Sequence, residues 1–166
     1  MRSGSGAAAI RTVRSPLRRL ADRGSAPRAD AMPLLLDTGV IYALADRDDA
    51  WHERCVAYLK HTRELLLVPI TVIPEAAYFI HERLGAAAER RFVRSIADRE
   101  LTVESLRDAD WQRIGELLDD YERIDVVDAS VVAMAERLKL DTIATTDRRD
   151  FGTIRPKHRP AFRLVP

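Results

Sequence analysis

From Met32 onward, short apolar runs alternate with longer amphipathic segments, and few architectures can accommodate such an alternation. Strands that alternate with helices indicate a parallel sheet covered by helices on both faces. We therefore expect an α/β domain of three layers, α/β/α, with a central parallel sheet of four to five strands. The expected strands are residues 34–37, 65–68, 100–105 and 141–147, with a short last strand at 161–165.

The segments between these runs show the apolar spacing of helices, and three of them give specific expectations. Thr71 is expected to cap the helix that follows the second strand. Residues 125–138 are apolar on nearly all sides and are expected to form a buried helix. A third helix is expected to begin at Asp108 and to turn these side chains inward: Trp111, Ile114, Leu117, Leu118 and Tyr121.

Charge is unevenly distributed along the 166 residues. Residues 1–31 contain seven arginines and two acids, which leaves 20 basic and 24 acidic side chains in residues 32–166. Because the first segment is also rich in Gly, Ser, Ala and Pro, we expect a basic, disordered extension there, with Met32 as an alternative start. The domain itself is expected to comprise residues 32–166.

The single cysteine, Cys55, cannot form an intramolecular disulfide. No apolar run reaches the length of a membrane span. These features are typical of a protein of the reducing cytoplasm, and we expect no membrane partner.

Four acidic residues stand at the positions where proteins with a parallel sheet usually carry their functional side chains. Asp37 ends the first expected strand, and Asp147 ends the fourth. Glu75 lies in the first turn of the helix after the second strand, and Asp128 lies near the start of the buried helix. Ligands bind such sheets at the carboxyl ends of the strands, so all four acids are expected at that edge.

Each acid also has a purely structural interpretation. Asp37 and Asp128 can cap helices, Glu75 is favoured by the helix dipole, and Asp147 is ordinary in a turn. Asp128 indicates function most strongly, because a carboxylate among valines and alanines is costly unless something compensates it. Asp125 can cap the same helix and is a rival for the role of Asp128.

Together, the acids predict a cation site. Carboxylates brought close repel one another unless a cation lies among them. Mg²⁺ and Mn²⁺ prefer oxygen ligands, and such ions assist phosphodiester hydrolysis. The histidines are scattered, and no zinc or Ser–His–Asp spacing is present. Metal-dependent phosphodiester hydrolysis is the chemistry that fits.

The triplet Asp37-Thr38-Gly39 also matches the catalytic loop of an aspartic protease. Those enzymes are all-β and need two such loops, or one from each subunit of a dimer. This chain has one, and helical segments follow it. The protease interpretation is therefore disfavoured.

Four motifs carry a family resemblance: "LLLDTGVIYAL", "ITVIPEAAY", "VVDASVVAMAERL" and "TIATTDRRDF". In their order and spacing, residues 32–166 resemble a PIN domain, in particular the VapC-type ribonuclease toxins of bacterial type II toxin–antitoxin modules. The resemblance implies a Mg²⁺- or Mn²⁺-dependent endoribonuclease that cleaves single-stranded RNA. It also implies a homodimer, a cognate antitoxin, and a metal site made by the four acids Asp37, Glu75, Asp128 and Asp147.

The same resemblance identifies Thr38 and Thr146 as helpers that order a water or a phosphate oxygen. Arg148, Arg149 and Arg47 are expected near the acidic edge as phosphate contacts, although each can equally be a solvated surface arginine. The alternative function is a non-catalytic PIN-fold module that binds RNA or protein. Retention of all four acids argues against it.

Overall fold

The computed structural model describes residues 32–166, so the expected basic extension lies outside the described residues. One sheet of five parallel strands runs through the molecule in the order β3-β2-β1-β4-β5. This confirms the expected parallel sheet. The strands are β1 (Leu34–Leu36), β2 (Leu66–Pro69), β3 (Thr102–Glu104), β4 (Thr142–Ala144) and β5 (Arg163–Val165).

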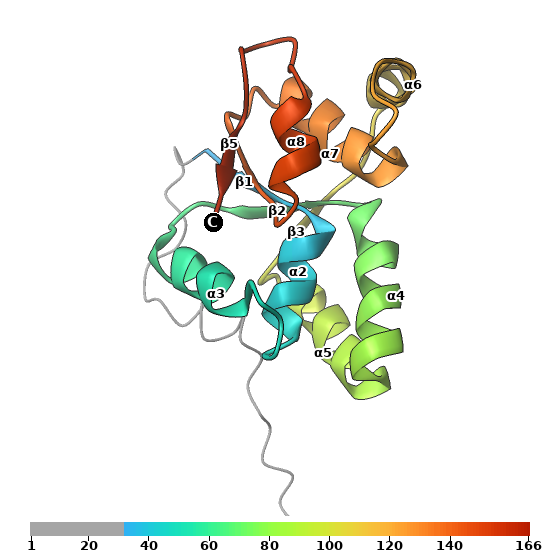
Figure 1. Ribbon diagram of the computed structural model, residues 1–166. Coiled ribbons are helices and arrows are strands. Elements are labelled where there is room, and N and C mark those ends of the chain that lie inside the picture. Colours follow the sequence, from blue (N-terminus) through green and yellow to red (C-terminus); the bar gives the residue numbers. More distant parts are fainter. Residues whose placement is uncertain (1–31) are drawn as a thin grey trace, which may run out of the picture.

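Helices cover both faces of the sheet, as the expected three layers require. Figure 1 shows α2 to α5 on one side of the sheet and α6 to α8 on the other. No helix of residues 32–166 is long and apolar enough to cross a membrane. The helices are α2 (Thr38–Ala45), α3 (His52–His61), α4 (Val72–Leu84), α5 (Ala86–Ala97), α6 (Asp108–Asp120), α7 (Val126–Arg137) and α8 (Arg148–Thr153).

The direction of strand order changes at β1, which pairs with β2 on one side and with β4 on the other. From β2 the chain continues outward to β3, and from β4 it continues outward to β5. In parallel sheets, ligands bind beside such a switch point, at the carboxyl ends of the two central strands. Asp37 follows β1 and Asp147 follows β4, so the topology places both acids at this edge.

The core is built from β1 and α7. Leu34, Leu35 and Leu36 are all fully buried, as is typical of a central strand with helices on both faces. In α7, every residue from 129 to 135 is buried, which confirms the expected buried helix. Val126, at its first turn, is exposed.

The expectation for α6 was wrong at two positions. Trp111 is 53% exposed and Leu118 is 39% exposed. The buried stripe instead runs through Asp110, Ile114 and Leu117, and the two exposed residues each lie one position, or about 100°, away from it. Asp110 can occupy a core-facing position because its carboxylate accepts two hydrogen bonds from Arg137 Nε, at 3.0 and 2.9 Å.

Thr71 occupies the N-cap position of α4, but its side chain makes no capping hydrogen bond. The backbone of Thr71 is already helical, with φ −65° and ψ −32°, whereas a capping residue usually has an extended backbone. Its hydroxyl lies 2.5 Å from the Ser130 hydroxyl of α7. The residue therefore joins two helices rather than closing the end of one.

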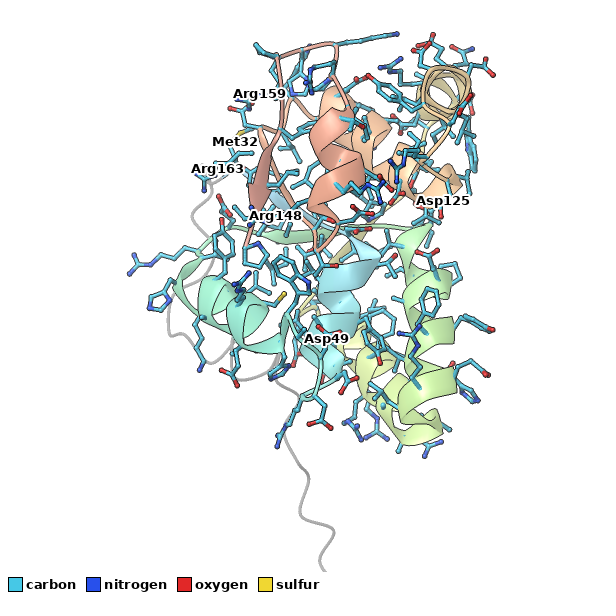
Figure 2. All side chains as sticks on the ribbon, viewed as in Figure 1. Met32, Asp49, Asp125, Arg148, Arg159 and Arg163 are labelled. Carbon is cyan, nitrogen blue, oxygen red and sulfur yellow. The ribbon has the colours of Figure 1, made fainter. Side chains whose placement is uncertain are left out.

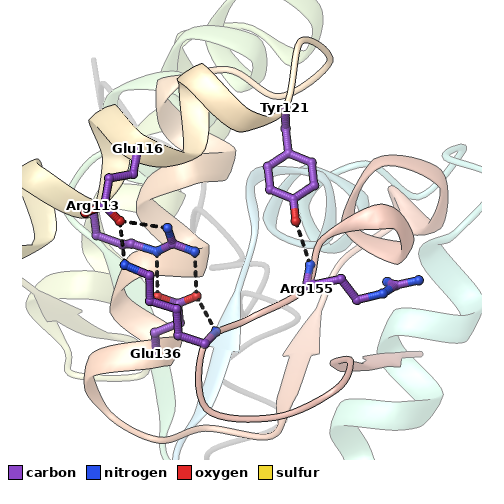
Figure 3. A network of polar contacts seen from close by, with 6 residues as sticks. Arg113, Glu116, Tyr121, Glu136 and Arg155 are labelled. Atoms are coloured by element: carbon purple, nitrogen blue, oxygen red, sulfur yellow. Dashed lines mark hydrogen bonds and ion pairs between the residues drawn. The ribbon is translucent and has the colours of Figure 1, made fainter.

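A network of polar contacts attaches the segment after α8 to α6 and α7 (Figure 3). Arg113 of α6 donates to both carboxylate oxygens of Glu136 of α7, at 2.8 and 3.1 Å. The Glu136 carboxylate also accepts from the main-chain N–H of Lys157, at 2.9 Å. Nearby, the Tyr121 hydroxyl accepts from the main-chain N–H of Arg155, at 3.0 Å. These contacts fix the connection that returns the chain to β5.

Candidate active site

Asp37 lies between β1 and α2 and is 5% exposed. One carboxylate oxygen accepts from the Thr38 N–H at 2.7 Å, and the other accepts from the Thr145 hydroxyl at 2.9 Å. Burial raises the pKa of Asp37 from 3.8 to about 6, the two hydrogen bonds oppose that rise, and the Glu75 carboxylate adds to it. Asp37 thus caps α2, and its buried carboxylate has a raised pKa.

Thr145 joins the first acid to the fourth, and the sequence analysis missed it. Its side chain is fully buried. While its hydroxyl donates to Asp37, its oxygen accepts from the Asp147 N–H at 2.9 Å. Thr146, the next residue, is the hydroxyl expected as a helper, and its role toward water or phosphate stays a prediction. The sequence Thr-Thr-Asp does not show which of the two hydroxyls faces Asp37, because side chains at the end of a strand point alternately to opposite faces of the sheet.

Thr38 joins the first acid to the second. Its hydroxyl donates to a carboxylate oxygen of Glu75 at 2.5 Å, while its N–H donates to Asp37. Glu75 stands in the first turn of α4. The helper role expected of Thr38 toward water or phosphate stays a prediction, but the structure gives it a second role, which is to hold two carboxylates.

Asp128 and Asp125 have different positions. Asp125 is the N-cap of α7, where one of its oxygens accepts from the N–H groups of Val127 and Asp128, at 2.8 and 3.0 Å. Asp128 stands in the first helical turn. Burial raises its pKa from 3.8 to about 7, and the carboxylates of Asp37, Asp125 and Asp147 add to that rise. Asp128 is therefore the acid whose pKa the neighbouring carboxylates raise, whereas Asp125 caps α7.

Asp147 is the N-cap of α8. One of its oxygens accepts from the N–H groups of Arg149 and Asp150, at 3.1 and 2.9 Å. The structural interpretation of this acid is therefore correct. It does not exclude a functional one, because Asp147 is also held to Asp37 through Thr145 and acts on the pKa of Asp128.

A known protein family has a model that matches the part of the chain carrying these four acids. The family model of the PIN domain matches residues 34–155, a range that includes all four acids. This chain belongs to the PIN domain family. The resemblance seen in the four sequence motifs is thereby confirmed.

Relatives of this PIN domain include ribonuclease VapC26 of Mycobacterium tuberculosis, which is 27% identical over 135 residues, 80% of this chain and 100% of that protein. VapC20 of the same organism, described as a sarcin–ricin loop cleaving toxin, superposes with a TM-score of 0.64 at 19% identity. That match covers 70% of this chain and 91% of VapC20. A toxin–antitoxin complex from Klebsiella pneumoniae superposes with a TM-score of 0.60 at 16% identity, over 80% of this chain and 96% of that one. At these identities the two structures show a shared fold.

The acids of this PIN domain fit a hard divalent cation by their chemistry, since they offer oxygen donors only. Their mutual repulsion is what a cation would relieve. Within residues 32–166, however, no three His, Cys, Asp or Glu side chains already form a group that could hold a metal ion. Hydrogen bonds through Thr38 and Thr145 join Asp37 to Glu75 and Asp147, whereas Asp128 is related to Asp37 and Asp147 by charge alone. A cation would have to draw the four acids closer.

The three arginines expected at this edge are not equally placed. Arg148 and Arg149 directly follow Asp147 and are exposed. In Figure 2, Arg148 lies by the end of β5, between that strand and α3. Arg47 lies beyond the far end of α2, about 12 Å along the helix from the Asp37 cap. The structure does not bring Arg47 to the acids.

Proposed function

We propose that this chain is a VapC-type ribonuclease toxin that hydrolyses phosphodiester bonds in single-stranded RNA with Mg²⁺ or Mn²⁺. The observation that carries the proposal is the set of four acids at the carboxyl edge of the sheet of a PIN domain. Burial, with a smaller contribution from neighbouring carboxylates, raises the pKa of Asp37 to about 6 and that of Asp128 to about 7, and shifts of this kind are typical of functional sites.

In this proposal Asp37, Glu75, Asp128 and Asp147 hold the cation. The bound ion supplies Lewis acidity and positive charge at the sheet edge. The protein's own groups orient the carboxylates: the Thr145 hydroxyl fixes Asp37, and the Thr38 hydroxyl fixes Glu75. Such support matters, because partners of metal ligands determine how well the ligands are oriented.

The proposed partners are RNA, a cognate antitoxin and a second copy of the chain, all in the cytoplasm. Support comes from the relatives, which are named as a ribonuclease, a toxin and a toxin–antitoxin complex. The acidic edge would also suit an antitoxin segment that inserts a cationic side chain in place of the metal.

The proposal is tested by comparing the wild type with Asp37→Asn and Asp128→Asn on single-stranded RNA, with Mg²⁺, Mn²⁺ or EDTA. We expect cleavage by the wild type with either ion, none in EDTA, and loss of cleavage in both variants. Asp119→Asn, which changes an exposed acid of α6, is the matched control and should cleave like the wild type. Equal cleavage by all four proteins, or cleavage unaffected by EDTA, would refute the site.

The alternative is a PIN-fold module that binds without catalysis. The absence of a preformed metal-binding group among the described residues is the observation that favours it. A wild type that binds RNA but neither cleaves it nor binds Mg²⁺ or Mn²⁺ would support this alternative.

A further inference from the structure

Trp51, at the start of α3, lies against two arginines from different parts of the chain. The Arg54 guanidinium carbon is 5.2 Å from the centre of the Trp51 ring, and that of Arg148 is 5.8 Å away. Arg54 belongs to α3, whereas Arg148 is the first residue of α8 and follows Asp147 directly. The cluster of Trp51, Arg54 and Arg148 therefore begins one residue from the acidic site.

Arg54 and Arg148 are both exposed. In the described part of the chain, neither of them forms an ion pair with an Asp or Glu side chain. By contrast, Arg113 and Arg137 are paired with acids at 2.8–3.2 Å and serve the packing of α6 and α7. Arg148 also donates to a main-chain oxygen of Pro166, so its side chain is held between Trp51 and the end of β5.

The main chain of Trp51 is held by two hydrogen bonds, which fix the point from which its ring extends toward the arginines. The main-chain N–H donates to the Asp49 carboxylate at 2.8 Å, and the main-chain carbonyl accepts from the Cys55 N–H at 2.9 Å. The next residue, His52, is buried, with a ring nitrogen 2.7 Å from the Ala43 carbonyl of α2. The main chain next to Trp51 is therefore attached, through His52, to α2, the helix that Asp37 caps.

The acidic site needs positive charge beside it if the ligand is RNA. Residues 32–166 carry 20 basic and 24 acidic side chains, and four of those acids meet at the proposed site. A polyanion is repelled there unless nearby cations bind its phosphates. Exposed arginines that no Asp or Glu side chain pairs with, held over an aromatic ring, are suited to that purpose.

We propose that Trp51 positions Arg54 and Arg148 as a clamp for the phosphates of the RNA strand next to the acidic site. This inference rests on the proposed function and extends it by assigning a binding site for the strand beside the scissile bond. Arg54 and Arg148 contact phosphate, and Trp51 is a positioning residue that acts through them.

The test measures binding of a fluorescently labelled single-stranded RNA oligonucleotide to the full chain in EDTA, by anisotropy at several salt concentrations. Arg54→Ala and Arg148→Ala are each expected to weaken binding and to reduce the slope of log Kd against log salt by about one, as the loss of one phosphate contact does. Trp51→Ala should lower the slope too, whereas Trp51→Phe, which keeps a ring, should retain most of the binding.

The chain supplies matched controls. Arg83 is an exposed arginine stacked at 5.2 Å on Tyr42 and on Phe79 near the far end of α4, and Trp111 is an exposed tryptophan of α6. Arg83→Ala and Trp111→Ala should bind RNA with the wild-type slope. A merely stabilising cluster would leave the salt slope unchanged in every variant.

Wild-type affinity and slope in folded Arg54→Ala and Arg148→Ala proteins would overturn the clamp. That result leaves the proposed function intact if the wild type still cleaves RNA. A wild type that neither binds nor cleaves RNA would remove both the clamp and the proposed function.

Discussion

At the scale of single residues, the hydroxyl of Thr145 holds two acids at once. Thr145→Val keeps the shape but removes the bond to Asp37 and the acceptor of the Asp147 N–H. Because these groups are buried or partly buried, we expect the free energy of unfolding to fall by about 1–3 kcal/mol. Urea unfolding measures the loss. Thr153→Val, at an exposed threonine of α8, should change stability by less than about 0.5 kcal/mol.

The same residue marks the limit of what the sequence could predict about the site. The acids could be found because each stands at a strand end or in a first helical turn. Thr145 could not be separated from Thr146, since that choice depends on which side chain the pleat of β4 turns toward Asp37. Likewise, the sequence did not show which of Asp125 and Asp128 caps α7. The position at which the helix begins shows that Asp125 is the cap and that Asp128 lies in the first turn.

At the scale of elements, replacing two helix glycines by alanine is expected to change stability in opposite directions. A Cβ on Gly39, in the first turn of α2, would overlap the Thr146 hydroxyl oxygen, whereas a Cβ on Gly115, inside α6, would meet nothing within 4 Å. We expect Gly39→Ala to destabilise the protein by about 1–3 kcal/mol through overpacking. Gly115→Ala should stabilise it by about 0.5–1 kcal/mol, because alanine favours a helix. Thermal unfolding of the two variants should shift in opposite directions; shifts of the same sign would contradict the packing of α2 on the β4 edge.

The positions of the elements were predicted well from the sequence, whereas the face that α6 buries was predicted less well. The expected strand at 34–37 ends one residue earlier, at Leu36, because Asp37 caps α2. In α6, apolarity pointed to Trp111 and Leu118, yet the charged Asp110 takes a buried position by pairing with Arg137. An ion pair between distant segments leaves no local pattern that would reveal it.

At the scale of the whole molecule, the acids make stability depend on pH. The pKa of Asp37 is about 6 and that of Asp128 about 7, against an ordinary 3.8. The folded state thus keeps protons that the unfolded chain releases, and this stabilisation is full below pH 3.8 and lost as pH rises through 6 and 7. We expect the free energy of unfolding in EDTA to fall by roughly 2–4 kcal/mol between about pH 5 and 8.

Urea unfolding of the wild type and of Asp128→Asn at both pH values measures this loss. The variant should lose less stability than the wild type over the same interval, since its amide does not titrate. An equal fall in the two proteins would show that other groups cause the pH dependence.

The alternation of strands and helices was enough to predict three layers and a parallel sheet. Strand order was not predicted, because it depends on long-range pairing that periodicity does not encode. That order matters for function: the reversal at β1 is what brings Asp37 beside the end of β4 and therefore near Asp147.

Calorimetric titration with Mn²⁺ near pH 7.5 tests most directly whether four acids from separate elements form one cation site. We expect the wild type to bind Mn²⁺, and Asp37→Asn, Asp128→Asn and Asp147→Asn each to weaken binding at least about tenfold, since even outer partners of metal ligands contribute that much. Asp119→Asn should bind like the wild type. No binding by the wild type, or equal binding by all the variants, would contradict the account.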